Sequence, residues 1–248
     1  MQTTLVTLAA TKMHTGVCIA GVRQGNPAVW VRPVRDFGAI LLGDITYPPD
    51  PGATPGAPRR VMRPFDVVEL TLGRSRATPP FIEDWTCDFA HHRPHLLGVL
   101  PPAERAAVLN AAARPPEMIF THGRRSLGVV GVEDVTATFF HDQYSGKYEA
   151  RLAFVGLPPG VAYAACTDLA WRALGRRLLA HHPALQVDQH GVRTLTLAGG
   201  DLRVALGGAA RIWLALGVSR AYQGRTWPLV VGVHTLPEYE ADVDYANL

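Results

Sequence analysis

Two short stretches of the chain place aromatic residues beside arginines. The first reads Trp-Val-Arg-Pro-Val-Arg-Asp-Phe from residue 30, and the second runs from Arg220 to Trp227. On a strand, Trp30 and Arg32 point to the same face, so that a ring and a guanidinium group would lie side by side. Proteins that bind single-stranded nucleic acid use such a pair, because bases stack on aromatic rings and phosphates bind cations. A core Trp30 with Arg32 lying over it fits the same pattern.

A further group of arginines lies on a predicted helix over residues 168–180. Thr167 suits the N-cap, Asp168 the first turn, and the helical repeat places Arg172 and Arg176 one turn apart on the face opposite the apolar stripe. One interpretation is that this face contacts phosphates. The alternative is a solvated face on which Asp168 and Arg172 form an ion pair. The residues predicted to bind nucleic acid are Trp30, Arg32, Arg35, Arg172, Arg176, Arg220, Tyr222 and Arg225.

Residues suited to catalysis or metal binding form no familiar pattern. The chain has no G-x-S-x-G, P-loop or H-E-x-x-H motif, and no G-x-G-x-x-G after a predicted strand. Its one dense histidine group, at 91–95, lies in a segment interrupted by proline, so we assign no metal site and no cofactor.

The elements that must position these residues are mostly strands. The 24 glycines and 20 prolines separate short runs rich in Val, Leu, Thr and aromatic residues, which is typical of an all-β barrel or sandwich. Strands are predicted at 4–10, 16–23, 28–34, 65–73 and 81–88, and then at 126–142, 147–155, 192–197, 202–206, 210–216 and 227–236. Tight hairpin turns are predicted at Gly199-Gly200-Asp201 and at Gly207-Gly208.

Each half of the chain therefore contains about five predicted strands, which is enough for a small barrel that closes on itself. We predict a mainly β fold with two small OB-like five-stranded barrels, a connecting helix and one helix in the second half. The predicted boundaries are 1–100 for the first barrel, 101–122 for the connecting helix and linker, 123–237 for the second barrel and 238–248 for an acidic tail.

Composition and charge limit the class of protein. Of the 248 residues 48% are hydrophobic and 18% are charged, a composition that can bury a core. Three cysteines far apart in the chain and the lack of a long apolar run predict a cytoplasmic protein without a membrane partner. The tail holds four carboxylates and no basic residue, so we expect it either to fray or to lie against the basic body in place of a polyanion.

Three motifs carry a resemblance to a known family. They are Trp-Val-Arg-Pro-Val at 30–34, Asp-Val-Val-Glu at 66–69 and Glu-Asp-Trp at 83–85, and two C-terminal stretches at 216–220 and 232–237 add to them. With these residues the chain resembles the bacterial dual OB-containing domain proteins. The resemblance implies two OB folds and, by analogy with OB folds in general, a role with nucleic acid or nucleotides. It implies no catalytic residues.

The sequence thus predicts a module that binds single-stranded DNA or RNA, or an oligonucleotide-like ligand, without catalysis of its own. An alternative is an enzyme acting on a nucleotide or nucleic acid, with Asp168 and Arg172 at the mouth of the second barrel. A protein-interaction scaffold is a further alternative.

Overall fold

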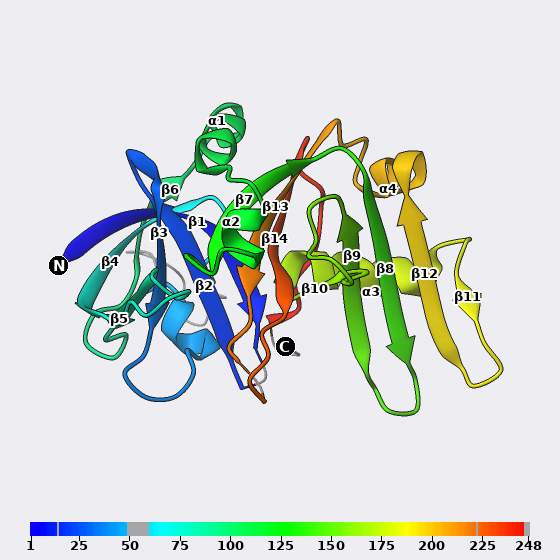
Figure 1. Ribbon diagram of the computed structural model, residues 1–248, viewed down its shortest axis with the longest axis horizontal. Helices are drawn as coiled ribbons and strands as arrows, with labels where there is room; N and C mark the ends of the chain where they lie inside the picture. Colours follow the sequence, from blue (N-terminus) through cyan, green and yellow to red (C-terminus); the bar gives the residue numbers. More distant parts are fainter. Residues whose placement is uncertain (14, 49–59, 222, 246–248) are drawn as a thin grey trace. The chain divides into compact units, whose positions relative to one another are not determined.

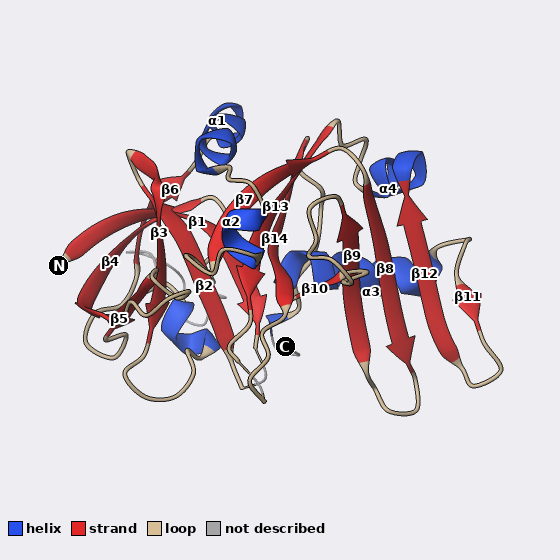
Figure 2. Cartoon of the chain, in the orientation of Figure 1, coloured by secondary structure: helices blue, strands red, loops and turns tan. Residues whose placement is uncertain are grey.

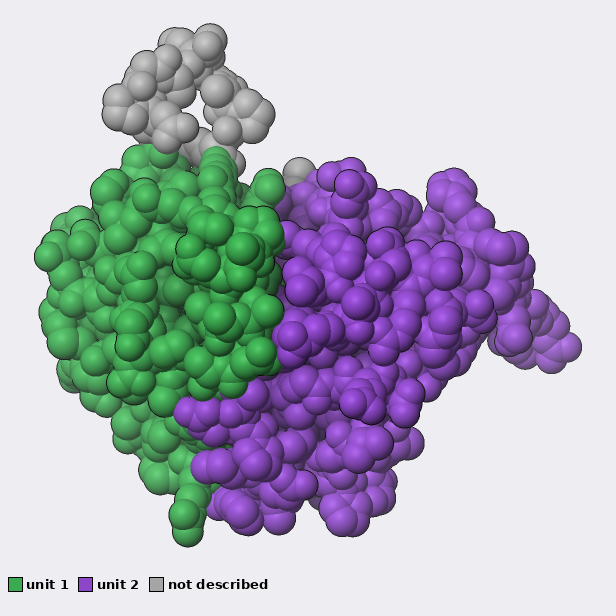
Figure 3. Space-filling model, turned by 90° about the horizontal axis from the view of Figure 1, so that it is seen from above, with its two compact units in different colours: residues 1–112, 124–127 green, residues 113–123, 128–248 purple. Residues whose placement is uncertain are grey.

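The computed structural model describes residues 1–13, 15–48, 60–221 and 223–245. The chain divides into two compact units, which Figure 3 shows in different colours. Unit 1 comprises Met1–Ala112 and Arg124–Leu127, and unit 2 comprises Ala113–Gly123 and Gly128–Leu248. Strands predominate in both units, so the predicted mainly β class is confirmed (Figure 2).

Unit 1 contains a closed five-stranded barrel (Figure 1). Its strands are β1 (Gln2–Lys12), β2 (Val17–Arg23), β3 (Asn26–Val34), β4 (Asp66–Ser75) and β5 (Asp84–Cys87). They follow the order β1-β2-β3-β5-β4, and β4 pairs with β1, which closes the ring. The β3–β5 pair is parallel and the other pairs of the ring are antiparallel. This barrel has the OB fold, as predicted.

Among the described residues of unit 1, three smaller elements accompany the barrel. The strand β6 (His95–Val99) pairs with β4 outside the ring. The 3-10 helix η1 (Leu42–Ile45) lies between β3 and β4 in the chain, and α1 (Pro102–Ala112) contacts β3.

A β-bulge and one glycine allow β1 to curve around the barrel. The β1–β2 register shifts between Thr7 and Ala9, which is where an extra residue bends the strand. On β2, a Cβ atom at Gly21 would lie 2.3 Å from the Val6 carbonyl oxygen. Glycine at this position therefore permits the close approach of the two backbones.

Unit 2 is built on one eight-stranded sheet with the order β11-β12-β8-β9-β10-β14-β13-β7. The strands are β7 (Leu127–Val132), β8 (Val135–Asp142), β9 (Tyr148–Phe154), β10 (Ala164–Cys166), β11 (Gln186–Val187), β12 (Val192–Ala198), β13 (Arg211–Val218) and β14 (Pro228–Leu236). The second half was expected to have about five strands, and this number is too low. Two short strands, β10 and β11, give too little periodicity to detect, and the expected strand over 126–142 is divided by Glu133-Asp134 into β7 and β8.

In the part of unit 2 that the structure describes, three helices accompany this sheet: α2 (Glu117–Phe120), α3 (Leu169–His181) and α4 (Gly199–Ala205). The hairpin turn predicted at 199–201 and the strand predicted at 202–206 are wrong, because these residues form α4. Leu202 and Leu206 are both buried, and their spacing of four residues places them on one side of a helical turn. Gly207, with a φ of 70°, ends the helix in the left-handed conformation that glycine favours.

The core of unit 2 lies between α3 and the sheet. Helix α3 contacts β8, β9 and β12 and runs behind these strands in the view of Figure 1. Trp171 of α3 is 1% exposed, and its ring centroid lies 5.5 Å from that of Phe139 on β8. None of the helices that the structure describes is long and apolar enough to cross a membrane.

Residues after β14 also pack on α3. The Tyr239 ring meets the Trp171 ring edge-on, with centroids 5.8 Å apart, and Arg177 Nη2 donates to the Glu240 carbonyl oxygen at 2.9 Å. The Tyr239 amide donates to Thr235 Oγ1 at 3.0 Å. The first residues of the acidic tail are therefore held against α3.

Candidate nucleic-acid interface

The barrel of unit 1 buries Trp30 and Arg32. Trp30 is 3% exposed, and Arg32 is 8% exposed. Arg32 Nε donates to Asp84 Oδ1 at 2.7 Å, and Arg32 Nη2 lies 2.6 Å from the same oxygen. The parallel register of β3 and β5 places these two residues beside each other. This geometry agrees with the core interpretation of the Trp30–Arg32 pair.

Two other acidic residues of the motifs, Glu83 and Asp66, also have partners within unit 1. Glu83 is 2% exposed and accepts hydrogen bonds from the amide and the hydroxyl of Ser126 at 3.0 and 2.9 Å. Asp66 is 1% exposed and accepts from Tyr47 Oη at 2.9 Å and from Arg60. Burial raises the pKa of Asp66, and these hydrogen bonds partly oppose that rise.

Arg35 lies just beyond the end of β3. Its Nη1 is 3.6 Å from Asp44 Oδ2 and donates to the Ala39 carbonyl oxygen at 3.4 Å. Its charge is thus partly balanced within the same segment of the chain.

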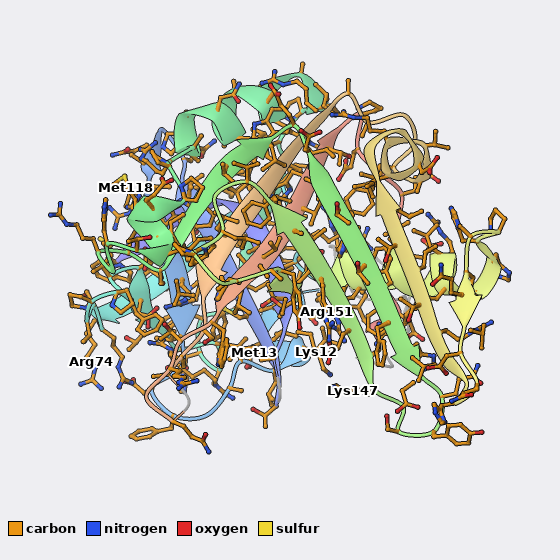
Figure 4. The ribbon with its side chains drawn as sticks, turned by 45° about the vertical axis from the view of Figure 1, so that its right-hand side comes forward. Lys12, Met13, Arg74, Met118, Lys147 and Arg151 are labelled. Carbon is orange, nitrogen blue, oxygen red and sulfur yellow. The ribbon has the colours of Figure 1, made fainter. Side chains whose placement is uncertain are left out.

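An exposed aromatic ring follows Arg35 in the sequence. Phe37 is 90% exposed, and the preceding Asp36 accepts from Arg74 Nη2 at 2.7 Å. The Asp36 carbonyl oxygen accepts from Arg76 Nη1 at 3.2 Å. Arg74, labelled in Figure 4, and Arg76 lie where β4 passes into the β4–β5 connection, a region that OB folds use to bind oligonucleotides. Sequence reasoning missed this group, because it comes together only in the folded barrel.

Helix α3 of unit 2 begins at a buried carboxylate. Asp168, and not Thr167 as predicted, is the N-cap: its Oδ1 accepts from the Trp171 amide at 2.9 Å. Its Oδ2 accepts from the Val233 amide on β14 at 2.9 Å. Burial raises the pKa of Asp168 to about 6. Both oxygens therefore hold backbone groups of α3 and β14, a structural role that differs from the predicted ion pair with Arg172.

Arg172 and Arg176 meet at one tyrosine of β9. Their guanidinium carbons lie 4.7 and 4.4 Å from the centroid of the Tyr148 ring, which is a cation–π geometry. Tyr148 Oη donates to the Arg172 carbonyl oxygen at 2.9 Å, so the ring is tied to the helix backbone at Arg172. The structure thus brings these two predicted residues together, as their spacing of one helical turn indicated.

A second cationic group lies on the opposite face of β9, because side chains alternate along a strand. Glu149 accepts from Arg151 Nε at 2.7 Å and lies 2.7 Å from Lys147 Nζ. These contacts, with the Lys147 hydrogen bond first, lower the pKa of Glu149. The Arg151 guanidinium lies 4.4 Å from the Tyr163 ring centroid. Figure 4 labels Lys147, which directly precedes β9, and Arg151 on the strand itself.

The connection between β13 and β14 carries Arg220, Arg225 and an exposed tryptophan. Trp227 is 53% exposed, and both arginines are exposed. The backbone of Trp227 is fixed, because its amide donates to Ser219 Oγ at 2.9 Å and its carbonyl oxygen accepts from the Ser219 amide at 3.0 Å. Tyr222, also predicted to bind nucleic acid, lies outside the described residues.

The histidine group at 91–95 contains an exposed ion pair with Asp88, in which His91 Nδ1 lies 2.7 Å from Asp88 Oδ2. Within the described ranges, no three His, Cys, Asp or Glu side chains gather in a way that could hold a metal ion.

These features define a mainly β protein with an OB-fold barrel and a second unit whose arginines lie beside aromatic rings. The model of one family, the dual OB-containing domain, matches residues 3–155, which are more than half of the chain, and the protein belongs to this family. Comparison with curated proteins and with solved structures gave no match. The matched range ends just after β9, so α3, β13 and β14 lie beyond it.

Proposed function

We propose that this protein binds single-stranded nucleic acid, DNA or RNA, without catalysing a reaction. The OB fold of unit 1 is consistent with such a role, since OB folds commonly bind oligonucleotides. The observation that carries the proposal is the surface of the β13–β14 connection, where a fixed and half-exposed Trp227 closely follows Arg220 and Arg225 in the sequence.

This arrangement supplies both interactions that a single strand requires. A base stacks on the exposed indole ring, and the arginines attract the neighbouring phosphates. Because Ser219 holds the Trp227 backbone from both sides, little backbone entropy remains to be lost when a base stacks. We favour Trp227 over Phe37 as the stacking residue because Ser219 fixes the Trp227 backbone through its amide and its carbonyl oxygen.

Trp227→Ala tests the proposal, with Phe37→Ala as a control that also removes an exposed ring. Loss of base stacking on Trp227 should weaken binding by about 1–3 kcal/mol, which is roughly 5- to 150-fold. Fluorescence anisotropy of a labelled oligothymidylate measures the affinity, and circular dichroism verifies folding. An unchanged affinity in Trp227→Ala, or no binding by the wild type at low salt, contradicts the proposal. A weakening confined to Phe37→Ala would move the site to the barrel of unit 1.

The charges of the same connection can be tested by salt. Replacing Arg220 and Arg225 by Gln should weaken binding and reduce the slope of log affinity against log salt concentration by about 0.7 for each phosphate that the variant no longer neutralises. The same titration, repeated at several salt concentrations, gives this slope. A slope equal to that of the wild type would show that these arginines do not bind phosphates.

A further inference from the structure

The Arg172–Tyr148–Arg176 group has an unbalanced positive charge. Among the described residues, no carboxylate oxygen lies within 4.0 Å of either guanidinium group, whereas the nearby Glu149 is occupied by Lys147 and Arg151. The two arginines also lie close enough that each adds positive potential at the other.

Arg172 is the less exposed of the pair, and its surroundings disfavour its charge. Burial lowers the pKa of Arg172, the positive charge of Arg176 adds to that effect, and nearby groups such as Glu149 oppose it only in part. Tyr148 donates its hydroxyl hydrogen to the helix backbone, so this hydroxyl group gives the guanidinium groups no negative charge. A bound anion would supply the missing charge and relieve the repulsion between the two cations.

We propose that Arg172 and Arg176, held on the Tyr148 ring, form a binding site for a phosphate monoester. Two guanidinium groups offer a charge of +2 and forked N–H donors, which match the tetrahedral oxygens of a phosphate. A monoester carries a charge of about −1.5 to −2 at neutral pH, whereas an internal phosphodiester carries one negative charge. The site therefore favours the terminal phosphate of a strand, or that of a free nucleotide, over the phosphates inside a strand.

This inference deepens the proposed function by naming the phosphate that the second unit prefers, but its first test needs no strand. Inorganic phosphate is titrated into the full chain by isothermal titration calorimetry at constant ionic strength. Arg176→Gln, at an exposed position, should weaken phosphate binding by about tenfold or more. Arg177→Gln is the matched control on the same helix, since Arg177 donates to the Glu240 carbonyl oxygen, and it should bind like the wild type.

A charge reversal separates a binding role from a structural one. In Arg176→Glu the new carboxylate lies one turn from Arg172 and takes the place of the anion. Phosphate binding should disappear, while the thermal midpoint in phosphate-free buffer should rise or stay unchanged. If Arg176 only supported the fold, the midpoint would fall.

The source of the phosphate follows from three further ligands: thymidine 5′-monophosphate and an oligothymidylate with and without a 5′-phosphate. Tighter binding of the phosphorylated strand than of the other two assigns the site to a strand end, and equal binding of the mononucleotide and the phosphorylated strand assigns it to nucleotides. Phosphate affinity that is absent in the wild type, or unchanged in Arg176→Gln, overturns the inference. Phosphate binding without binding of any oligonucleotide would refute the proposed function and leave this site standing.

Discussion

The buried ion pair between Arg32 and Asp84 decides whether Arg32 serves the fold or a ligand. Their side chains are 9% and 4% exposed, and two nitrogens of Arg32 lie within 2.7 Å of one Asp84 oxygen. Asp84→Asn removes the carboxylate that pairs with the buried guanidinium, and Arg32→Met removes the guanidinium that pairs with the buried carboxylate. Each change should lower the free energy of unfolding by about 3–5 kcal/mol.

The double variant Arg32→Met with Asp84→Asn removes both charges together. Its cost should be smaller than the sum of the two single effects by about 2 kcal/mol or more, because no isolated buried charge remains. Urea unfolding followed by far-UV circular dichroism gives these free energies. Arg74→Met is the control: its pair with Asp36 is exposed, and its removal should cost less than about 1 kcal/mol.

Two results would refute this reasoning. One is a cost of Asp84→Asn no larger than that of Arg74→Met, and the other is additivity of the two single effects. An Arg32→Met protein that keeps its stability but loses oligonucleotide binding would show that Arg32 contacts the ligand.

Three further predictions concern α3. The pKa of Asp168 is about 6 in the folded protein against an ordinary 3.8, so between these pH values the folded state binds a proton that the unfolded state does not. The contribution of Asp168 to the free energy of unfolding therefore decreases as pH rises through that range. Urea unfolding at several pH values should show this dependence in the wild type and not in Asp168→Asn. Deleting residues 238–248 removes the Tyr239 ring from its contact with Trp171 and should lower stability by about 1–3 kcal/mol, measured by urea unfolding, whether or not binding changes. Gly175→Ala adds a Cβ atom 2.2 Å from a ring carbon of Phe139, and this overpacking should cost about 1–3 kcal/mol in the same assay despite the better helix propensity of alanine.

Local patterns predicted the elements that bury one regular face or stripe. The alternation over 65–73 corresponds to β4, and the apolar stripe over 168–180 corresponds to α3. The same kind of reasoning failed at 199–206, where Gly-Gly suggested a turn although Leu202 and Leu206 have helical spacing. The partners of Glu83 could not be predicted, because Ser126 is 43 residues further along the chain and reaches it only in the folded unit.

For the candidate site, the limit of sequence reasoning is seen in two tryptophans with similar neighbours. Trp30 and Trp227 each lie close to arginines in the sequence, and both neighbourhoods suggested stacking beside a cation. Trp30 is in the middle of a strand of a closed barrel and is buried, whereas Trp227 lies where the β13–β14 connection returns to the sheet and is half exposed. The two tryptophans differ because Trp30 lies within a barrel that closes on itself. That closure depends on the pairing of β1 with β4, two strands that are far apart in the sequence.

The family match and the proposed binding residues concern different parts of the chain. Within the matched range, the motif residues Arg32, Asp66, Glu83 and Asp84 have buried partners in unit 1, so the match reports how the barrel is built. The arginines and the tryptophan of the proposed site follow residue 155, where the match ends. Membership in the family therefore supports the OB fold without locating a ligand. The proposed binding role rests on side chains of unit 2, and substitutions on α3 and the β13–β14 connection are the changes that test it most directly.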